Sequence, residues 1–181
     1  IALGHIAMPK YVSRGVVRWA RRERLLEVLD RPAGPDGFTG RNTIKRVLPA
    51  LEKLAGRRFF LFVHFKTADK MAHVAGDESE RYLEAIMNVD KRLGELLVKL
   101  GELGIARTTD IYVTTDHGFH GRRHVVDDFP TNVATWIASS AHDLRGDAGA
   151  TVLDIVPTVL AKLGADPRSV DPPLPGRSLL K

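Results

Sequence analysis

The sequence predicts an α/β fold with a mainly parallel sheet, because three segments with the right patterns follow one another in the chain. Residues 57–65 form a nearly continuous apolar run with four phenylalanines, which is typical of a strand covered on both faces. Apolar residues then recur at helical spacing from 78 to 103, and 110–115 is a short β-branched strand. A strand, a helix and a strand in this order form a right-handed crossover, so we expect the two strands to lie parallel in one sheet.

The helices of this region have recognisable ends. In residues 43–54 apolar side chains repeat at three and four, with Asn42 as the expected N-cap and Gly56 as the stop. The longer helix is opened by the acidic residues 77 and 78, which suit a helix N-terminus, and is closed by Gly104. We therefore expect two well-defined helices, one before the first strand and one after it.

The remainder of the C-terminal region is predicted with shorter elements. Residues 132–139 are a third strand candidate. Residues 151–164 have a helical pattern that contains Pro157, which should kink the helix or lie in its first turn. The proline-rich residues 171–180 are predicted to form a loop.

The N-terminal region carries the positive charge of the protein. Residues 10–24 contain six basic residues and one acidic residue, a net charge of +5 that equals the net charge of the whole chain. They predict an amphipathic basic helix, followed at 30–42 by a loop rich in proline and glycine. We divide the chain into 1–42, a possible lid or connector, and 43–181, the α/β region. The basic face is read as a solvated surface or as an anion-binding patch.

The composition excludes several classes of protein. With 181 residues, 44% of them hydrophobic and 27% charged, the chain is a globular domain and not a disordered one. It has no cysteine, so it contains no disulfide and any metal site must use His, Asp and Glu. No apolar run approaches the roughly 20 residues that span a membrane. Nucleic acid is an unfavoured partner, because no aromatic residues alternate with the arginines.

Two clusters of potential metal ligands follow the ends of the predicted strands. Asp69 and His73 lie beyond the first, and Asp116 and His117 directly follow the second. Ligands bind outside the carboxyl ends of strands in open α/β sheets, so we expect both clusters to meet in one site. Carboxylates and imidazoles suit Zn²⁺ or Mn²⁺, and two ions ~3.5–4 Å apart can clamp the oxygens of a displacement at phosphorus. The alternative without metal binding is that each aspartate caps a turn and each histidine lies on the surface.

Three more histidines are considered for this site. His120 and His124 compete as the remaining ligand. His64 lies near the end of the first strand, where a role in the core or behind a ligand is favoured over ligation.

The motifs then point to a known family. The segments FFLFVHFKTADKMAH, IYVTTDHGFHGRRH, TVLDIVPTVLAKLG and PGRSLL resemble the C-terminal half of the alkaline phosphatase superfamily, over roughly residues 43–180. Within it, the chain is most similar to type I phosphodiesterases and nucleotide pyrophosphatases, which share core motifs with sulfatases. The resemblance implies a three-layer α/β/α fold around a mainly parallel sheet, incomplete in this chain. It also implies two divalent metals, with zinc preferred to manganese.

The resemblance assigns ligands residue by residue. Asp69, His73 and His124 resemble the set that binds one metal, and Asp116 and His117 resemble part of the set that binds the other. His124 is preferred because similar proteins place this ligand after DHGF, a glycine and a short basic stretch; His120 is the reserve. One departure is Ala72 of DKMAH, which stands where many relatives have glycine.

The resemblance also implies parts that we do not find here. The family's first strand, with a metal-binding Asp and a Thr or Ser nucleophile, has no counterpart before Asp69, and neither Thr39 nor Thr43 has the strand context of a nucleophile. We therefore expect this chain to be the C-terminal portion of a larger enzyme, with its N-terminal half as a partner and the catalytic nucleophile outside the chain. Alone, we expect it to bind one metal and catalyse nothing.

The implied activity is hydrolysis of phosphate esters through a covalent intermediate. Alternatives within the superfamily are a sulfatase, acting on sulfate esters, and a phosphoglycerate mutase-like enzyme. An alternative of another class is a non-catalytic module that binds anions or nucleic acid through residues 10–24. Sulfatases of the usual type use Ca²⁺, which prefers oxygen ligands and so fits three imidazoles poorly.

Overall fold

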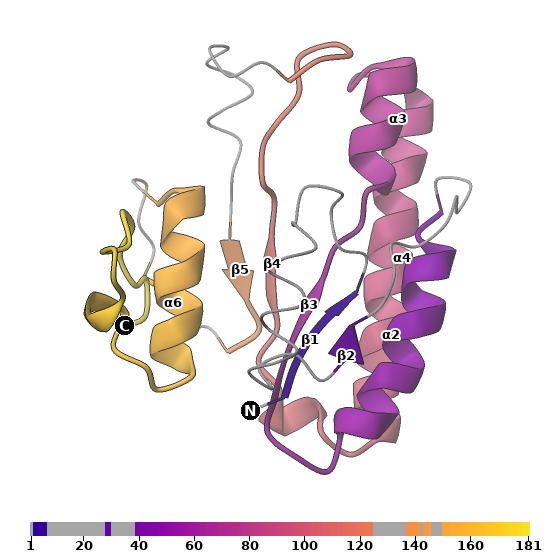
Figure 1. Ribbon diagram of the computed structural model, residues 1–181. Coiled ribbons are helices and arrows are strands. Elements are labelled where there is room, and N and C mark those ends of the chain that lie inside the picture. Colours follow the sequence, from indigo (N-terminus) through magenta and orange to yellow (C-terminus); the bar gives the residue numbers. More distant parts are fainter. Residues whose placement is uncertain (1, 7–27, 30–38, 125–136, 142, 146–149) are drawn as a thin grey trace. The chain divides into compact units, whose positions relative to one another are not determined.

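A computed structural model of the protein describes residues 2–6, 28–29, 39–124, 137–141, 143–145 and 150–181 (Figure 1). The chain divides into two compact units, Ile1–Thr109 and Asp110–Lys181, and each is considered by itself. Both units combine helices with strands, so the predicted α/β class is confirmed.

A parallel three-stranded sheet lies in the first unit. Its strands are β1 (Ala2–Ile6), β2 (Val28–Leu29) and β3 (Phe59–Val63), in the order β2-β1-β3. β1 and β3 pair in parallel over five residues each. β3 confirms the strand predicted within 57–65, but the expectation of cover on both faces is wrong at Phe62, whose side chain is 44% exposed.

Helix α2 (Arg41–Leu54) confirms the helix predicted at 43–54. It buries one stripe of side chains, which includes Ile44, Val47 and Leu51. The expectation that Asn42 is its N-cap is wrong, because the helix begins two residues earlier: Gly40, with a φ of +67°, occupies the cap position and leaves Asn42 inside the first turn. This left-handed conformation favours glycine.

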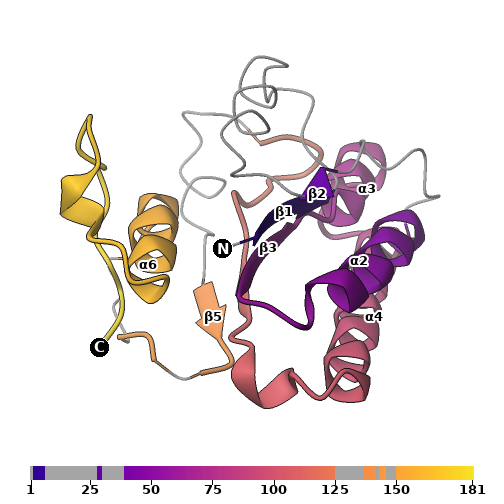
Figure 2. The same cartoon turned by 60° about the horizontal axis from the view of Figure 1, so that its bottom comes forward.

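Two helices follow β3 in the first unit. The sequence prediction missed α3 (Thr67–Ala75), whereas α4 (Glu80–Glu102) confirms the long helix expected between 78 and 103. The side chain of Ser79 caps α4 by accepting a hydrogen bond from the Tyr82 N–H at 3.2 Å, and Gly104 follows its end with a φ of +70°. α4 packs against both α2 and α3, beside the parallel sheet (Figures 1 and 2).

The second unit is built on an antiparallel strand pair. β4 (Tyr112–Thr114) pairs with β5 (Ile137–Ser139), which forms the end of the strand candidate at 132–139. Within the described ranges β3 and β4 belong to different sheets, so the predicted parallel arrangement of 57–65 and 110–115 in one sheet is not found there. The three residues of β4 have their backbone partners in β5, with Tyr112 opposite Ser139.

The end of the chain is anchored on a short helix. A turn of 3₁₀ helix (Val152–Asp154) leads into α6 (Ile155–Lys162), and Pro157 lies in the first turn of α6, one of the two placements predicted for it. A second 3₁₀ turn (Pro167–Ser169) precedes the irregular tail predicted at 171–180. The tail is held by the Leu179 N–H, which donates to the Thr158 hydroxyl at 3.0 Å.

Several sequence predictions fall outside the described residues. These include the basic segment 10–24, most of the loop at 30–42 and the start of the strand candidate at 132–139. Among the helices that the structure describes, none has the length and apolar character needed to cross a lipid bilayer.

Candidate metal centre

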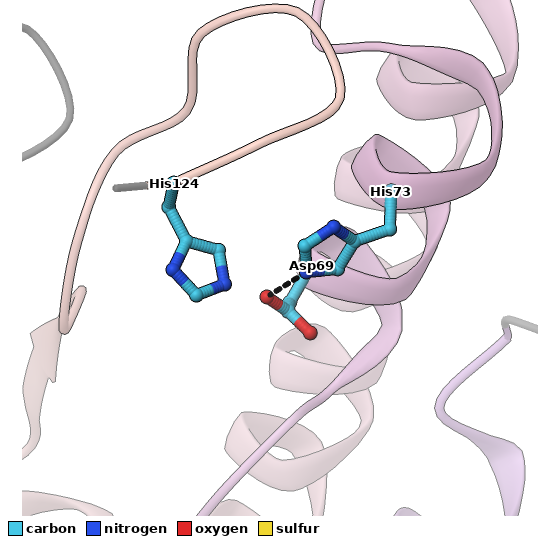
Figure 3. A group of neighbouring side chains, drawn as sticks. All are labelled: Asp69, His73 and His124. Atoms are coloured by element: carbon cyan, nitrogen blue, oxygen red, sulfur yellow. Dashed lines mark ion pairs between the residues drawn. The ribbon is translucent and has the colours of Figure 1, made fainter. Parts of the chain in front are cut away.

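Asp69 and His73 lie four residues apart on α3, which begins soon after the end of β3. Residues with this spacing share one face of a helix. The Nε2 atom of His73 lies 3.6 Å from Oδ1 of Asp69, and the two side chains are 45% and 42% exposed (Figure 3). Asp69 is in the first turn, where the helix dipole favours a carboxylate. Ala72, which replaces the glycine of relatives, is completely buried, so the unit accommodates its methyl group.

The distance between these two atoms suits an ion better than a hydrogen bond. Protein N–H···O hydrogen bonds span about 2.7–3.2 Å, which is shorter than the observed 3.6 Å. Two ligand atoms on one tetrahedral zinc ion, each about 2.0–2.2 Å from the metal, lie roughly 3.3–3.6 Å apart. Asp69 and His73 can therefore share an ion with little movement.

Tyr82 contributes to the electrostatics of this part of the first unit. Burial raises the pKa of the Tyr82 phenol, and the negative charges of Asp77 and Asp69 raise it further. Tyr82 therefore remains a neutral hydroxyl at physiological pH.

Asp116 and His117 form a second pair, in the loop directly after β4. Oδ2 of Asp116 lies 3.7 Å from Nε2 of His117, which again exceeds a hydrogen bond. Oδ1 of Asp116 accepts a hydrogen bond from the His117 backbone N–H at 3.1 Å. His117 Nδ1 lies 2.9 Å from the carbonyl oxygen of Gly118. A carbonyl oxygen can only accept, so Nδ1 carries the proton and the lone pair of Nε2 can bind a metal.

His124 is brought next to His117 by a tight turn within the second unit. Backbone hydrogen bonds between His120 and Arg123 close the turn, at 2.9 and 3.2 Å, and Gly121 at its tip has a φ of +61°. The rings of His117 and His124 are stacked, with centroids 3.9 Å apart. Within residues 110–124, all of which are described, His120 makes no ring contact of this kind.

The structure thus groups the predicted ligands within each unit. Asp69 pairs with His73 in the first unit, and Asp116 and His124 each lie beside His117 in the second. His64 is half-buried and directly follows β3, and its role behind a ligand stays a prediction.

Comparisons with known proteins agree with these motifs. The sequence model of the family "Type I phosphodiesterase / nucleotide pyrophosphatase" matches residues 7–169. Mouse steryl-sulfatase is 34% identical to the chain over 101 residues, which cover 52% of this chain and 16% of the sulfatase. The chain thus spans about a sixth of that relative's length. No solved structure matches the chain.

The family match covers the β3–α3 segment, α4 and the loop after β4, which carry all five predicted ligands. It also reaches upstream of the region where we had recognised the resemblance, and the similarity to a sulfatase is consistent with a core that the two groups share. The chain therefore belongs to the type I phosphodiesterase and nucleotide pyrophosphatase family, within the alkaline phosphatase superfamily.

Proposed function

We propose that the protein is a metal-dependent hydrolase of phosphate esters, of the phosphodiesterase or phosphatase type. The observation that carries the proposal is the repeated geometry of two aspartate–histidine pairs. Each pair lies at a family motif and holds a carboxylate oxygen and an imidazole nitrogen 3.6–3.7 Å apart. This spacing suits two donors on one metal ion.

We assign Asp69, His73 and His124 to one divalent ion and Asp116 and His117 to a second. Figure 3 draws the three side chains of the first set. The first set provides one carboxylate and two imidazoles, a combination that zinc accepts in catalytic sites and that leaves a position open for water or substrate. The second set needs further ligands, which we place outside this chain together with the nucleophile.

The residues of this chain would bind the ions, orient them and fix their spacing. When bound, two such ions stabilise negative charge on the phosphoryl oxygens and activate a hydroxyl for attack at phosphorus. The hydrogen bond from His117 Nδ1 to the Gly118 carbonyl oxygen orients the imidazole before an ion arrives. In the proposed reaction the oxygen of the nucleophile bonds to phosphorus as the bond to the ester's leaving alcohol breaks, and water then cleaves this covalent intermediate, which releases the phosphate product and restores the nucleophile.

A sulfate ester is the second candidate substrate, favoured by the similarity to steryl-sulfatase. The chemistry of the proposed ligands favours a phosphate ester over a sulfate ester as the substrate. The proposed sites use the imidazoles of His73, His117 and His124, and nitrogen ligands suit Zn²⁺ or Mn²⁺, whereas Ca²⁺ takes oxygen ligands.

The proposal is tested by metal stoichiometry. The purified chain is loaded with Zn²⁺ or Mn²⁺, passed through a desalting column and subjected to elemental analysis. We expect roughly one to two equivalents of zinc, reduced in Asp69→Asn and in His117→Ala. Asp166→Asn is the matched control, because Asp166 is an exposed carboxylate paired with Arg168 in the second unit. No bound metal in the folded wild-type chain, or equal binding by all variants, would contradict the proposal.

Zinc binding by two alanine variants tests whether His124 or His120 is the third ligand of the first set. Both are exposed histidines at the same turn, so His120→Ala is matched to His124→Ala in size, charge and location. We expect His124→Ala to lose zinc and His120→Ala to retain it. The reverse result would move the ligand to His120.

Substrate class is tested with the longest protein that contains this chain. Chromogenic phosphodiester, phosphomonoester and sulfate ester substrates are compared in the same buffer with and without chelator. The proposal requires chelator-sensitive cleavage of a phosphate ester, lost by at least 100-fold in His117→Ala. Preferential cleavage of the sulfate ester would instead support the second candidate.

A further inference from the structure

Phe119 lies in the loop that carries the proposed ligands, two residues after His117. Its ring centroid is 5.5 Å from that of His117, with the ring planes tilted by 55°. It is 5.1 Å from that of His124, in an edge-to-face arrangement at 80°. Both distances fall in the ~4.5–7 Å range of favourable aromatic pairs. One half-buried phenyl ring therefore contacts both imidazoles.

The backbone explains how one residue reaches both rings. The turn closed by His120 and Arg123 is a minimal antiparallel ladder. The next opposed pair along such a ladder is Phe119 and His124, and side chains directly opposite each other in a ladder interact. His117 lies two residues before Phe119, and its ring stacks on that of His124.

Phenylalanine has neither a metal-binding atom nor an ionisable group, so its contribution to this cluster is positional. The hydrogen bond between His117 Nδ1 and the Gly118 carbonyl oxygen already orients one imidazole. The His124 ring stacks on His117 and meets Phe119 edge-to-face, so both contacts restrict its orientation.

We propose that Phe119 is a positioning residue, which holds the His117 and His124 rings in place for metal binding. The proposal rests on the proposed function, because it takes these two histidines as ligands. Groups that orient metal ligands without touching the metal typically change affinity by about 10–100-fold. Phe119 would do so through ring packing instead of a hydrogen bond.

The test measures zinc affinity of the full chain by competition with a chromophoric chelator. We expect Phe119→Leu to weaken binding by about 10-fold or more, and Phe119→Tyr, which restores an aromatic ring, to bind within about threefold of wild type. The matched control is Phe62→Leu, which removes an exposed phenyl ring from β3 in the other unit. Unchanged affinity in Phe119→Leu would overturn the proposal.

A second readout needs no metal and separates positioning from folding. In the metal-free chain, the imidazole protons of His117 and His124 should show ring-current shifts in proton NMR spectra, assigned with His117→Ala and His124→Ala. These shifts should shrink in Phe119→Leu while the dispersed amide resonances of α6 remain. Unmoved imidazole resonances would also overturn the proposal.

Failure of this inference is distinguishable from failure of the proposed function. If His124→Ala loses zinc while Phe119→Leu retains it, the ligand assignment stands and the positioning role is wrong. If neither variant affects zinc binding by a chain that binds zinc, the ligand assignment itself is wrong, and the positioning role is wrong with it.

Discussion

Replacement of Asp154 by alanine should release the C-terminal tail from α6. The Asp154 side chain is only 4% exposed. Its Oδ1 accepts a hydrogen bond from the Arg177 N–H at 2.8 Å, and its Oδ2 accepts one from the Thr151 N–H, also at 2.8 Å. Hydrogen bonds to charged groups contribute about 1.5–3 kcal/mol each. Loss of both should therefore destabilise this anchor by about 3 kcal/mol or more.

Amide hydrogen exchange followed by NMR measures this loss locally. A change of about 3 kcal/mol corresponds to roughly 100-fold faster exchange, provided that the equilibrium population of the locally opened state sets the exchange rate. We expect this acceleration at the N–H groups of Arg177 and Leu179, which are bonded to Asp154 and Thr158. Asp166→Ala, at an exposed aspartate of the same unit, should leave them unchanged. Less than threefold acceleration in Asp154→Ala would refute the reasoning.

The same carboxylate gives the anchor a pH dependence. Burial acts to raise the pKa of Asp154, but hydrogen bonds from Arg177 and Thr151 outweigh it and hold the pKa below its usual value. Its stabilising effect is therefore present above the unfolded pKa of about 3.9 and is lost as the pH falls through the lower folded pKa. The stability difference between wild type and Asp154→Asn should shrink in that acidic window.

Two further predictions concern the same unit, and both are checked by urea unfolding. Gly176→Ala should lower the unfolding free energy by about 2 kcal/mol, because a Cβ there would lie 2.1 Å from the backbone oxygen of Leu153; a change below about 0.5 kcal/mol would contradict the close approach. Lys162→Met removes ion pairs to Asp143 at 2.7 Å and Asp110 at 2.9 Å, and should cost roughly 1 kcal/mol after allowance for solvent. The hydrogen bonds from Lys162 to these two aspartates raise its pKa, so its contribution is complete below the unfolded value of about 10.4 and is lost only as the pH rises through the folded pKa. Equal stability of Lys162→Met and wild type at pH 7 would argue against these ion pairs.

The helices could be predicted from sequence more completely than the sheets. The apolar repeats that predicted α2 and α4 are local and span 14 and 23 residues. β1 was missed because its sequence, ALGHI, contains a glycine and a histidine, and its partner β3 lies more than 50 residues away. Local patterns do not encode such distant pairing. For the same reason, 57–65 and 110–115 could be predicted as strands but their partners could not.

The residues of the two proposed ligand pairs could be predicted from the sequence, but the arrangement of their side chains could not. Asp69 and His73 are four residues apart, and with buried Met71 and Ala72 between them the spacing could have revealed helix α3. The approach of His124 to His117 depends on the left-handed Gly121 at the tip of an intervening turn. A turn of this kind is set by backbone angles, which the GRR sequence permits without dictating.

The geometry of Asp69 and Asp116 bears on the alternative that each of them only caps a turn. The N-cap position of α3 belongs to Lys66, and Asp69 lies inside the first turn. Asp116 Oδ1 does accept a hydrogen bond from a backbone N–H, and its Oδ2 lies 3.7 Å from the Nε2 atom of His117. Capping bonds do not explain the matched nitrogen–oxygen distances of 3.6 and 3.7 Å. In the proposed function, one shared cation at each pair would account for both distances, so metal stoichiometry is the measurement that tests it.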